Sequence, residues 1–201
     1  MQNKSPFKTS LNIRLAETGE EREQVFKLRY KVYIEEMGKT SHYADSHHKT
    51  IIEPLDNSAK ILAAFYNNRL VGTARNNLAR SSNLEYYPQL YQMDYVGDAH
   101  PKFTSISGKL MVQKELRGNQ IALHLIRENY RQLLLEGIRF DFSECDSELV
   151  AYYSKIGYKS IGTLNHPEYG EGTIIMLDLL DLDYLEQINS PLKDICKTFL
   201  A

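Results

Sequence analysis

The stretch after residue 109 combines residue types that suit the binding of a phosphate group. An apolar segment ends at Val112, the chain turns at Gly118, and an amphipathic helix begins near Ala122. The first amides of a helix have no partners within it, and the helix dipole is positive at that end, so anions bind there. Gly118 allows a close approach of the backbone, and Ala122 keeps the first turn slim. Taken alone, this stretch is equally well explained as a plain turn between a strand and a helix.

A second stretch carries two neighbouring tyrosines, whose hydroxyls can donate hydrogen bonds. Tyr152 and Tyr153 lie on a short predicted helix that ends at Gly157, just before a strand that begins at Tyr158. A tyrosine hydroxyl donates and accepts hydrogen bonds, so Tyr153 can protonate a leaving group that it contacts. The alternative is a half-buried helical residue whose hydroxyl is satisfied within the protein.

Together the two stretches resemble the GNAT superfamily of acyltransferases. Its phosphate loop has the pattern Arg/Gln-x-x-Gly-x-Gly/Ala, which corresponds to Arg117–Ala122, and a later Tyr-x-x-x-Gly-Phe/Tyr corresponds to Tyr153–Tyr158. Order and spacing match across roughly the last half of the chain, except that Gln120 stands at the middle glycine. The resemblance implies an α/β (α+β) fold, the GNAT fold. This has a mixed, mostly antiparallel twisted sheet of about seven strands with helices on both faces.

The first half of the chain carries a narrower resemblance. Phe26–Gly38 is similar to the first helix of long-chain N-acyl amino acid synthases, which are related to the autoinducer (acyl-homoserine-lactone) synthases. Asp56, Ile61–Tyr66 and Gly72–Arg75 continue this likeness. The subgroup implies a fatty acyl chain on acyl carrier protein as the donor. Lys109 stands where its members tend to have an arginine.

The resemblance also implies which residues form the site. Val112 would polarise the thioester carbonyl through its backbone N–H, and Tyr153 would be the general acid at the leaving sulfur. Asp146 falls where many relatives have an asparagine that contacts the pantetheine arm. The residues implied in donor binding are Leu110, Met111, Val112, Arg117, Gly118, Asn119, Gln120, Ile121, Ala122 and Asp146. Those implied in acceptor binding are Arg29, Tyr33 and Arg75.

Several of these assignments have alternatives in the sequence. Ion pairs with an acidic residue such as Asp56 would explain Arg29 and Arg75 equally well. Cys145 is expected to be a buried structural thiol, because direct attack needs no covalent intermediate. The general base is left open, and the candidates are Glu35, Glu36, Asp56, Glu144, His42, His47 and His48. No acidic or cysteine partner completes a metal spacing with these histidines, so no metal is expected.

The sequence therefore predicts an N-acyltransferase that works by direct attack. It would move an acyl group from a pantetheine thioester, on acyl carrier protein or CoA, to the amine of a small acceptor such as an amino acid. An ordinary acetyl-CoA-dependent N-acetyltransferase of a small amine or protein is the first alternative. A non-catalytic acyl-binding module is the second, because a fold alone does not decide function.

The composition argues against several other classes of protein. The chain has 201 residues, of which 42% are hydrophobic and 25% charged, with a formal net charge of -2. This balance, without a basic stripe, argues against a nucleic-acid partner. Neither a long apolar run nor an apolar core in residues 1–10 is present, so no membrane span or signal peptide is expected. Two cysteines without metal or disulfide spacing favour the cytoplasm. The oligomeric state is left open.

The elements that must position these residues follow from the hydrophobic pattern. We expect a domain over 1–180 and a helical tail over 181–201 that breaks at Pro191. Asn67 and Asn68 predict a tight hairpin, because asparagine tolerates positive φ. Strands are predicted at 12–16, 60–66, 70–78, 103–113, 138–142, 158–162 and 173–179, and the strand at 138–142 should lie beside the one at 103–113. Helices are predicted from 20 to 38, from the turn at 118 to 137, and over 147–156, with a loop at 39–58 and one irregular helix within 81–102.

Overall fold

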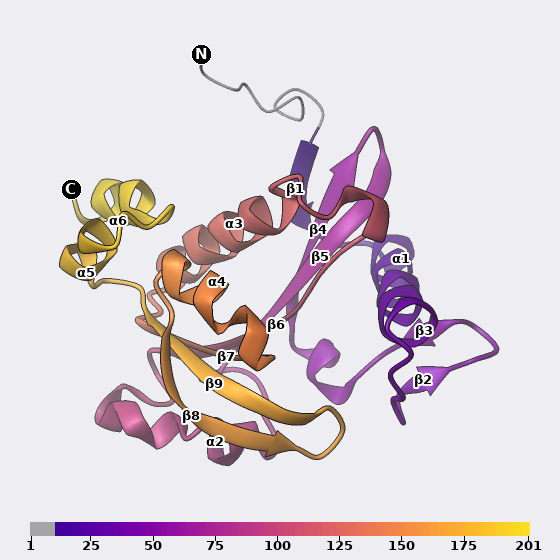
Figure 1. The fold of residues 1–201 in the computed structure, drawn as a ribbon, viewed down its shortest axis with the longest axis horizontal. Coiled ribbons are helices and arrows are strands. Elements are labelled where there is room, and N and C mark those ends of the chain that lie inside the picture. Colours follow the sequence, from indigo (N-terminus) through magenta and orange to yellow (C-terminus); the bar gives the residue numbers. More distant parts are fainter. Residues whose placement is uncertain (1–10) are drawn as a thin grey trace.

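The predicted strands assemble into one twisted mixed sheet in the computed structural model, which describes residues 11–201 (Figure 1). Its strand order is β1-β4-β5-β6-β7-β9-β8, and among these residues only β6 and β7 are parallel neighbours. The strands are β1 (Leu11–Leu15), β4 (Lys60–Tyr66), β5 (Arg69–Leu78), β6 (Thr104–Val112), β7 (Phe140–Cys145), β8 (Lys159–His166) and β9 (Gly170–Asp178). This confirms the predicted fold class and the predicted neighbours β6 and β7. The expectation about a signal peptide concerns residues 1–10, outside the described part.

Helices cover both faces of the sheet because its central strands are apolar on both sides. Along β4, Ile61 and Ala63 pack in the cluster of α1 (Gly19–Tyr30), whereas Leu62 packs in the cluster of α3 (Ile121–Leu135). Successive side chains of a strand point to opposite faces, so an unbroken apolar run needs cover on both. Figure 1 shows α1 on one side of these strands and α3 on the other.

The first helix begins and ends where the sequence indicates, but its winding changes. Thr18 and Glu21 form a capping box, in which each side chain accepts the backbone N–H of the other. After Tyr30 the helix continues as a π-helical segment, η1 (Lys31–Glu36), and Gly38 ends it with a φ of +63°. Apolar periodicity does not distinguish these windings, so the sequence predicts the helix but not its π-helical part.

The segments predicted as irregular contain short elements. Residues 39–58 hold β2 (Ala44–Asp45), β3 (Thr50–Ile51) and the 3-10 turn η2 (Pro54–Asn57). Residues 81–102 hold α2 (Tyr87–Leu90) and the 3-10 segment η3 (Met93–Ala99), rather than one irregular helix. Each element is too short for a periodic apolar pattern, which explains why the sequence does not reveal it.

Two hairpins illustrate what the side-chain pattern can predict. Asn67 and Asn68 have φ values of +51° and +61°, so the predicted turn between β4 and β5 is confirmed. The hairpin of β8 and β9 is longer than predicted, because its outer pairs are polar. Asn165 lies opposite Glu171 there, and backbone pairing extends the strands without an apolar pattern.

The C-terminal tail packs onto the sheet domain. It consists of α5 (Leu182–Gln187) and α6 (Lys193–Leu200), with the predicted break at Pro191 between them. Leu185, Leu192 and Cys196 have no exposed surface and share a core cluster with α3. The domain boundary at residue 180 stays a prediction. No helix within residues 11–201 is long and apolar enough to cross a membrane.

The sheet opens between β6 and β7, and this opening positions the site. The parallel pairing of β6 and β7 extends only from Thr104 opposite Phe140 to Ile106 opposite Phe142. Beyond Ile106 the register of β6 against β5 shifts, and Lys109 has a φ of +52°. A bulge of this kind bends a strand and increases its twist. The last residues of β6 therefore diverge from β7 and leave a gap.

Candidate active site

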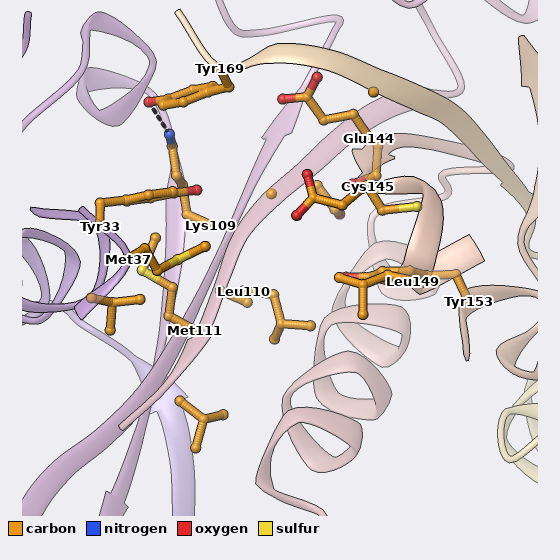
Figure 2. Close-up of a pocket in the computed structure, with 18 of the residues that line it drawn as sticks. Tyr33, Met37, Lys109, Leu110, Met111, Glu144, Cys145, Leu149, Tyr153 and Tyr169 are labelled. Carbon is orange, nitrogen blue, oxygen red and sulfur yellow. Dashed lines mark hydrogen bonds between the residues drawn. The ribbon is translucent and has the colours of Figure 1, made fainter. Parts of the chain in front are cut away.

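A cavity of about 360 Å³ fills the gap between the diverging strands. One wall carries Tyr33 and Met37 from the end of the first helix, together with Lys109 and Met111 of β6. Figure 2 shows the opposite wall, formed by Glu144 and Cys145 of β7 and by Leu149 and Tyr153 of the following helical segment. These last two belong to the 3-10 turn η5 (Ser147–Leu149) and to α4 (Val150–Ile156). Tyr169, in the turn between β8 and β9, lies at the edge of the cavity.

The bulge at Lys109 determines which side chains face which wall. Ser105 and Ser107 lie on the face of β6 that meets Asp141, and strict alternation would also place Lys109 on that face. The extra residue reverses the alternation, so Lys109 and Met111 lie on the α1 side and Leu110 and Val112 on the α3 side. The site thus receives a cation on one wall and apolar side chains on the other.

The backbone of Val112 faces the gap. The Gln113 N–H donates to the Val71 carbonyl over 2.9 Å, and Met111 lies opposite Thr73 in the same register. Hydrogen-bonding groups alternate between the two edges of a strand, so the N–H and C=O of Val112 point away from β5. Its carbonyl accepts the Arg117 Nε over 3.0 Å. The Val112 N–H therefore faces the gap, where the sequence expects a thioester carbonyl.

The loop before α3 leaves the helix start open to solvent. Gln120 adopts the left-handed conformation, with a φ of +60°, and its side chain makes no capping hydrogen bond. Gly118 has a φ of +86°, and no atom lies within 4 Å of the position its Cβ would take. Ile121 is buried and anchors the first turn. The first amides of α3 are thus without side-chain partners, as an anion site requires.

The predicted donor-binding residues fall into two groups. Those that line the cavity are Leu110, Met111, Val112, Arg117 and Asp146. Those at the open helix start, outside the cavity lining, are Gly118, Asn119, Gln120, Ile121 and Ala122. Arg117 also pairs with Glu36 over 2.5 Å, so its guanidinium joins the loop to the end of the first helix.

The glycine before Tyr158 has a clear packing reason. Gly157 has a φ of +132°, and a Cβ there would lie 2.6 Å from Leu185 Cδ2 and 3.0 Å from Leu177 Cδ1. This lets the tail helix α5 pack closely against the end of α4. Tyr153 lines the cavity, and among residues 11–201 its hydroxyl has no hydrogen-bond partner. Burial raises the pKa of Tyr153, so the phenol is protonated at neutral pH.

The acidic side of the cavity contains a carboxyl group that titrates near neutral pH. Burial raises the pKa of Glu144 to about 7, with Lys109 opposing and Asp146 adding to the shift. The Glu144 side chain is 24% exposed and points into the cavity in Figure 2. Burial raises the pKa of Cys145 to about 11, so its thiol stays protonated and is a weak nucleophile.

The other candidate bases lie outside the cavity lining. Asp56 is buried in an ion pair, Glu35 pairs with Lys49, and Glu36 pairs with Arg117. His42 lies against Glu168 and His48 against Asp45, and His47 is on the same exposed hairpin. In residues 11–201 no group of three or more histidine, cysteine, aspartate or glutamate side chains is arranged to hold a metal ion.

The cationic side of the cavity is a buried network that sequence reasoning missed. The Lys109 ammonium donates to the Tyr169 hydroxyl over 2.6 Å and pairs with the Glu53 carboxylate. The Tyr169 hydroxyl in turn donates to Glu53 over 2.6 Å. Burial, partly offset by the Glu53 charge, lowers the pKa of Lys109 to about 8. The partners lie 56 and 60 residues from Lys109, so no local pattern could have indicated them.

The predicted acceptor residues are not all brought together. Tyr33 lines the cavity and stacks on Tyr169, with ring centroids 5.5 Å apart. Arg29 is fully buried and donates to Asp56 over 2.7 Å, and Arg75 is bound to Glu53 over 2.6 Å. Neither arginine lines the cavity. These contacts match the alternative of structural arginines, and they leave both side chains almost wholly buried.

Residues 24–179 match the model of the family described as FeeM, N-acyl amino acid synthase. No curated protein matches the sequence. The structure of FeeM, an N-acyl amino acid synthase from uncultured soil microbes, is similar with a TM-score of 0.69 and 16% identity, over 92% of this chain and 97% of that one. The CoA-dependent acyl-homoserine lactone synthase BjaI, with SAM and isopentyl-CoA, has a TM-score of 0.67 and 17% identity over 96% and 99%. ElaA from Escherichia coli has a TM-score of 0.59 and 13% identity over 84% and 99%. At such identities the structural likeness concerns the fold alone.

Proposed function

The chain belongs to the FeeM family of N-acyl amino acid synthases and is therefore an acyltransferase that acts on an amine. We propose that it transfers an acyl group from a pantetheine thioester to an amino acid. The observation that carries this proposal is the pair of groups across the cavity. Glu144, with a pKa raised to about 7, and the Lys109 ammonium face the space in which the reaction would occur.

The donor is proposed to bind along the last residues of β6. Its phosphate binds the open amides at the start of α3, and its arm extends back beside Val112 into the gap between the strands. The thioester carbonyl then accepts the Val112 N–H, which stabilises the negative charge that develops on that oxygen. Asp146 lines the cavity beside the arm.

Glu144 is the proposed general base and Tyr153 the proposed general acid. The amine nitrogen attacks the carbonyl carbon while Glu144 accepts a proton from the amine. The C–S bond breaks, and the Tyr153 hydroxyl protonates the leaving sulfur. The products are an amide and a free thiol, and solvent returns the proton of Glu144 to Tyr153. A base with a pKa near neutral pH is about half ionised at pH 7 and still accepts a proton effectively.

The charge around Lys109 supports an acceptor that carries a carboxylate. Within residues 11–201 the buried network contains three cations, Arg29, Arg75 and Lys109, and two carboxylates, Glu53 and Asp56. Of the cations, Lys109 lines the cavity, and its ammonium has three N–H donors for two polar partners, the Tyr169 hydroxyl and Glu53. The rings of Tyr33 and Tyr169 lie beside it, with centroids 5.0 and 4.2 Å from the nitrogen. An amino acid can therefore place its carboxylate toward Lys109 and its amine toward Glu144.

We propose acyl carrier protein as the preferred carrier of the donor. The arm of a carrier protein brings one phosphate, whereas CoA brings a pyrophosphate and a further phosphate. Arg117 is already occupied by Glu36 and the Val112 carbonyl, and Gln120 replaces a glycine of the loop. The helix start therefore offers backbone amides for a single phosphate and few free cations for more. A lower KM for an acyl carrier protein thioester than for the same acyl-CoA would support this preference, and the reverse order would refute it.

Mass spectrometry of the product tests the reaction. The protein is incubated with a mixture of acyl thioesters and amino acids, and we expect N-acyl amino acids together with free thiol. Glu144→Gln and Tyr153→Phe should each reduce the yield strongly, while Glu148→Gln and Tyr152→Phe, whose side chains lie outside the cavity lining, should not. If the unaltered protein forms no amide with any donor, the proposed function is wrong. If only acetyl-CoA reacts, the protein is an ordinary acetyltransferase.

A further inference from the structure

The inner end of the cavity, where β6 and β7 join, is polar. Ser107 of β6 and Asn129 of α3 line the cavity there, next to the last paired residues of the two strands. The apolar side chains of Leu110 and Ile126 belong to the same lining. Ser107 and Asn129 form a hydrogen-bonding floor beside these apolar side chains, and buried polar groups of this kind need partners.

A chain of hydrogen bonds holds this floor in place. Asn76 donates to the Asn129 carbonyl oxygen over 2.6 Å, and the Asn129 amide donates to the Ser107 hydroxyl over 2.8 Å. Ser107 donates to the fully buried Asp141 over 2.9 Å. Tyr158, which also lines the cavity, donates to the same carboxylate over 2.8 Å. The hydrogen bonds run in one direction, from Asn76 through Asn129 and Ser107 to Asp141, so the side chains of Ser107 and Asn129 are fixed in orientation.

The floor retains unused hydrogen-bonding capacity. The Asn129 amide has two N–H groups, and Ser107 accepts one of them. The Asn129 carbonyl oxygen and the Ser107 hydroxyl oxygen each accept one hydrogen bond and have a second lone pair. Within residues 11–201 no further partner reaches these groups. A ligand that meets the floor can therefore both donate to it and accept from it.

The proposed binding mode brings the acyl group to this floor. Along β6 the thioester lies at Val112 and the arm enters from the phosphate loop, so the acyl group points back past Leu110 toward Ser107. The whole cavity of about 360 Å³ is near the lower end of the usual range for ligand sites. In a cavity of this size the acyl group passes close to the floor.

We propose that Ser107 and Asn129 form a subsite for a neutral oxygen substituent on the acyl group, so that hydroxyacyl or oxoacyl thioesters are preferred donors. This rests on the proposed function and specifies its donor. A saturated chain would cover the free N–H and lone pairs without replacing their hydrogen bonds. A carboxylate at the end of the chain is disfavoured, because Asp141 lies directly behind Ser107 and carries a like charge.

The test compares donors of equal length. Butanoyl and hexanoyl thioesters are compared with the analogues that carry a hydroxyl on the penultimate carbon, and with the succinyl thioester, using the same amino acid mixture. Each acyl group is offered both on acyl carrier protein and on CoA. We expect kcat/KM about tenfold higher for the hydroxyacyl donor of at least one length, the usual effect of one net hydrogen bond. The succinyl thioester should be the poorest donor of the set on either carrier.

Variants separate the floor from the rest of the site. Asn129→Leu and Ser107→Ala should each reduce the preference for the hydroxyacyl donor to near unity while the saturated donor still reacts. Asn165→Leu, an equivalent change on an exposed residue of β8, should leave the preference intact. If Asn129→Leu does not fold, as thermal melting will reveal, Ser107→Ala decides.

The outcomes distinguish this inference from the function on which it rests. Equal or better turnover of saturated donors at both lengths overturns the subsite and leaves the acyltransferase proposal standing. A preference that survives both substitutions also overturns it, because the selecting group would then lie elsewhere. Absence of turnover with every thioester overturns both.

Discussion

The pH dependence of acyl transfer should report the ionisation of Glu144. The pKa of this carboxyl is raised to about 7, and only its ionised form can accept the amine proton. Below pH 7, kcat/KM should therefore rise about tenfold per pH unit, since one unit below its pKa roughly one tenth of an acid is ionised. Above pH 7 the contribution of Glu144 should level off, and any further rise reports deprotonation of the acceptor amine. Thiol release, followed with a colorimetric reagent, measures the profile.

Two neighbouring charges shift the pKa of Glu144 in opposite directions, which two variants can check. The negative charge of Asp146 raises the pKa of Glu144, whereas the positive charge of Lys39 lowers it. Asp146→Asn should consequently move the acidic limb of the profile to lower pH, and Lys39→Gln should move it to higher pH. Glu144→Gln should remove the limb and reduce kcat by about 10²–10⁴, the usual contribution of a general base.

Two results would refute the role of Glu144. A limb near pH 7 that persists in Glu144→Gln belongs to another group. The same conclusion follows if the Asp146 and Lys39 variants shift the limb in one direction. Acceptors whose amines differ in basicity provide the control, because a limb due to the enzyme stays in place when the acceptor changes.

Three further predictions concern stability. Gly157→Ala should lower the free energy of unfolding by roughly 2–4 kcal/mol in urea denaturation, from left-handed strain and overpacking against Leu185; a loss below about 1 kcal/mol would contradict this. Gln120→Gly removes the strain of a positive φ at a residue with a side chain, so the melting temperature of the variant should be equal or higher. The KM for the donor should be unchanged. A several-fold higher KM would show that the glutamine side chain contacts the donor. Burial raises the pKa of Asp141 from 3.8 to about 6, so the stability that it contributes is present below about pH 4 and is lost as the pH rises to 6. Asp141→Asn should remove this dependence of the free energy of unfolding on pH and gain at most about 3 kcal/mol at pH 7. A melting temperature with the same pH profile in the variant would refute this.

Local sequence signals predicted the parts of the fold that depend on neighbouring residues. Asn67 and Asn68 predicted a hairpin because the turn itself demands positive φ at both positions. The stretch from Val112 to Ala122 predicted an open helix start, because strand, turn and helix follow one another directly. The resemblance to GNAT acyltransferases implied a position for Tyr153 near the leaving sulfur, and in the structure Tyr153 lines the cavity. The catalytic role of Tyr153 stays a prediction.

The cationic side of the site could not be predicted from local patterns. Glu53 precedes a short 3-10 turn and Tyr169 lies in a hairpin turn, and neither segment has a periodic apolar pattern. Their meeting with Lys109 depends on how separate elements pack. The same packing buries Arg29 and Arg75 against Asp56 and Glu53, whereas the sequence left open whether these arginines were structural or faced the acceptor.

The backbone at Lys109 links both halves of the proposed site. A positive φ costs a lysine on the order of 1 kcal/mol, and such strain persists only where the surroundings enforce it. Here the ion pair with Glu53 and the hydrogen bond to Tyr169 hold the side chain on the α1 side, which alternation along an unbroken strand would not allow. The same bulge turns β6 away from β7 and opens the cavity beside Val112. The charge that would bind the acceptor and the gap that would admit the thioester therefore depend on one irregular residue, so selection for either would preserve both.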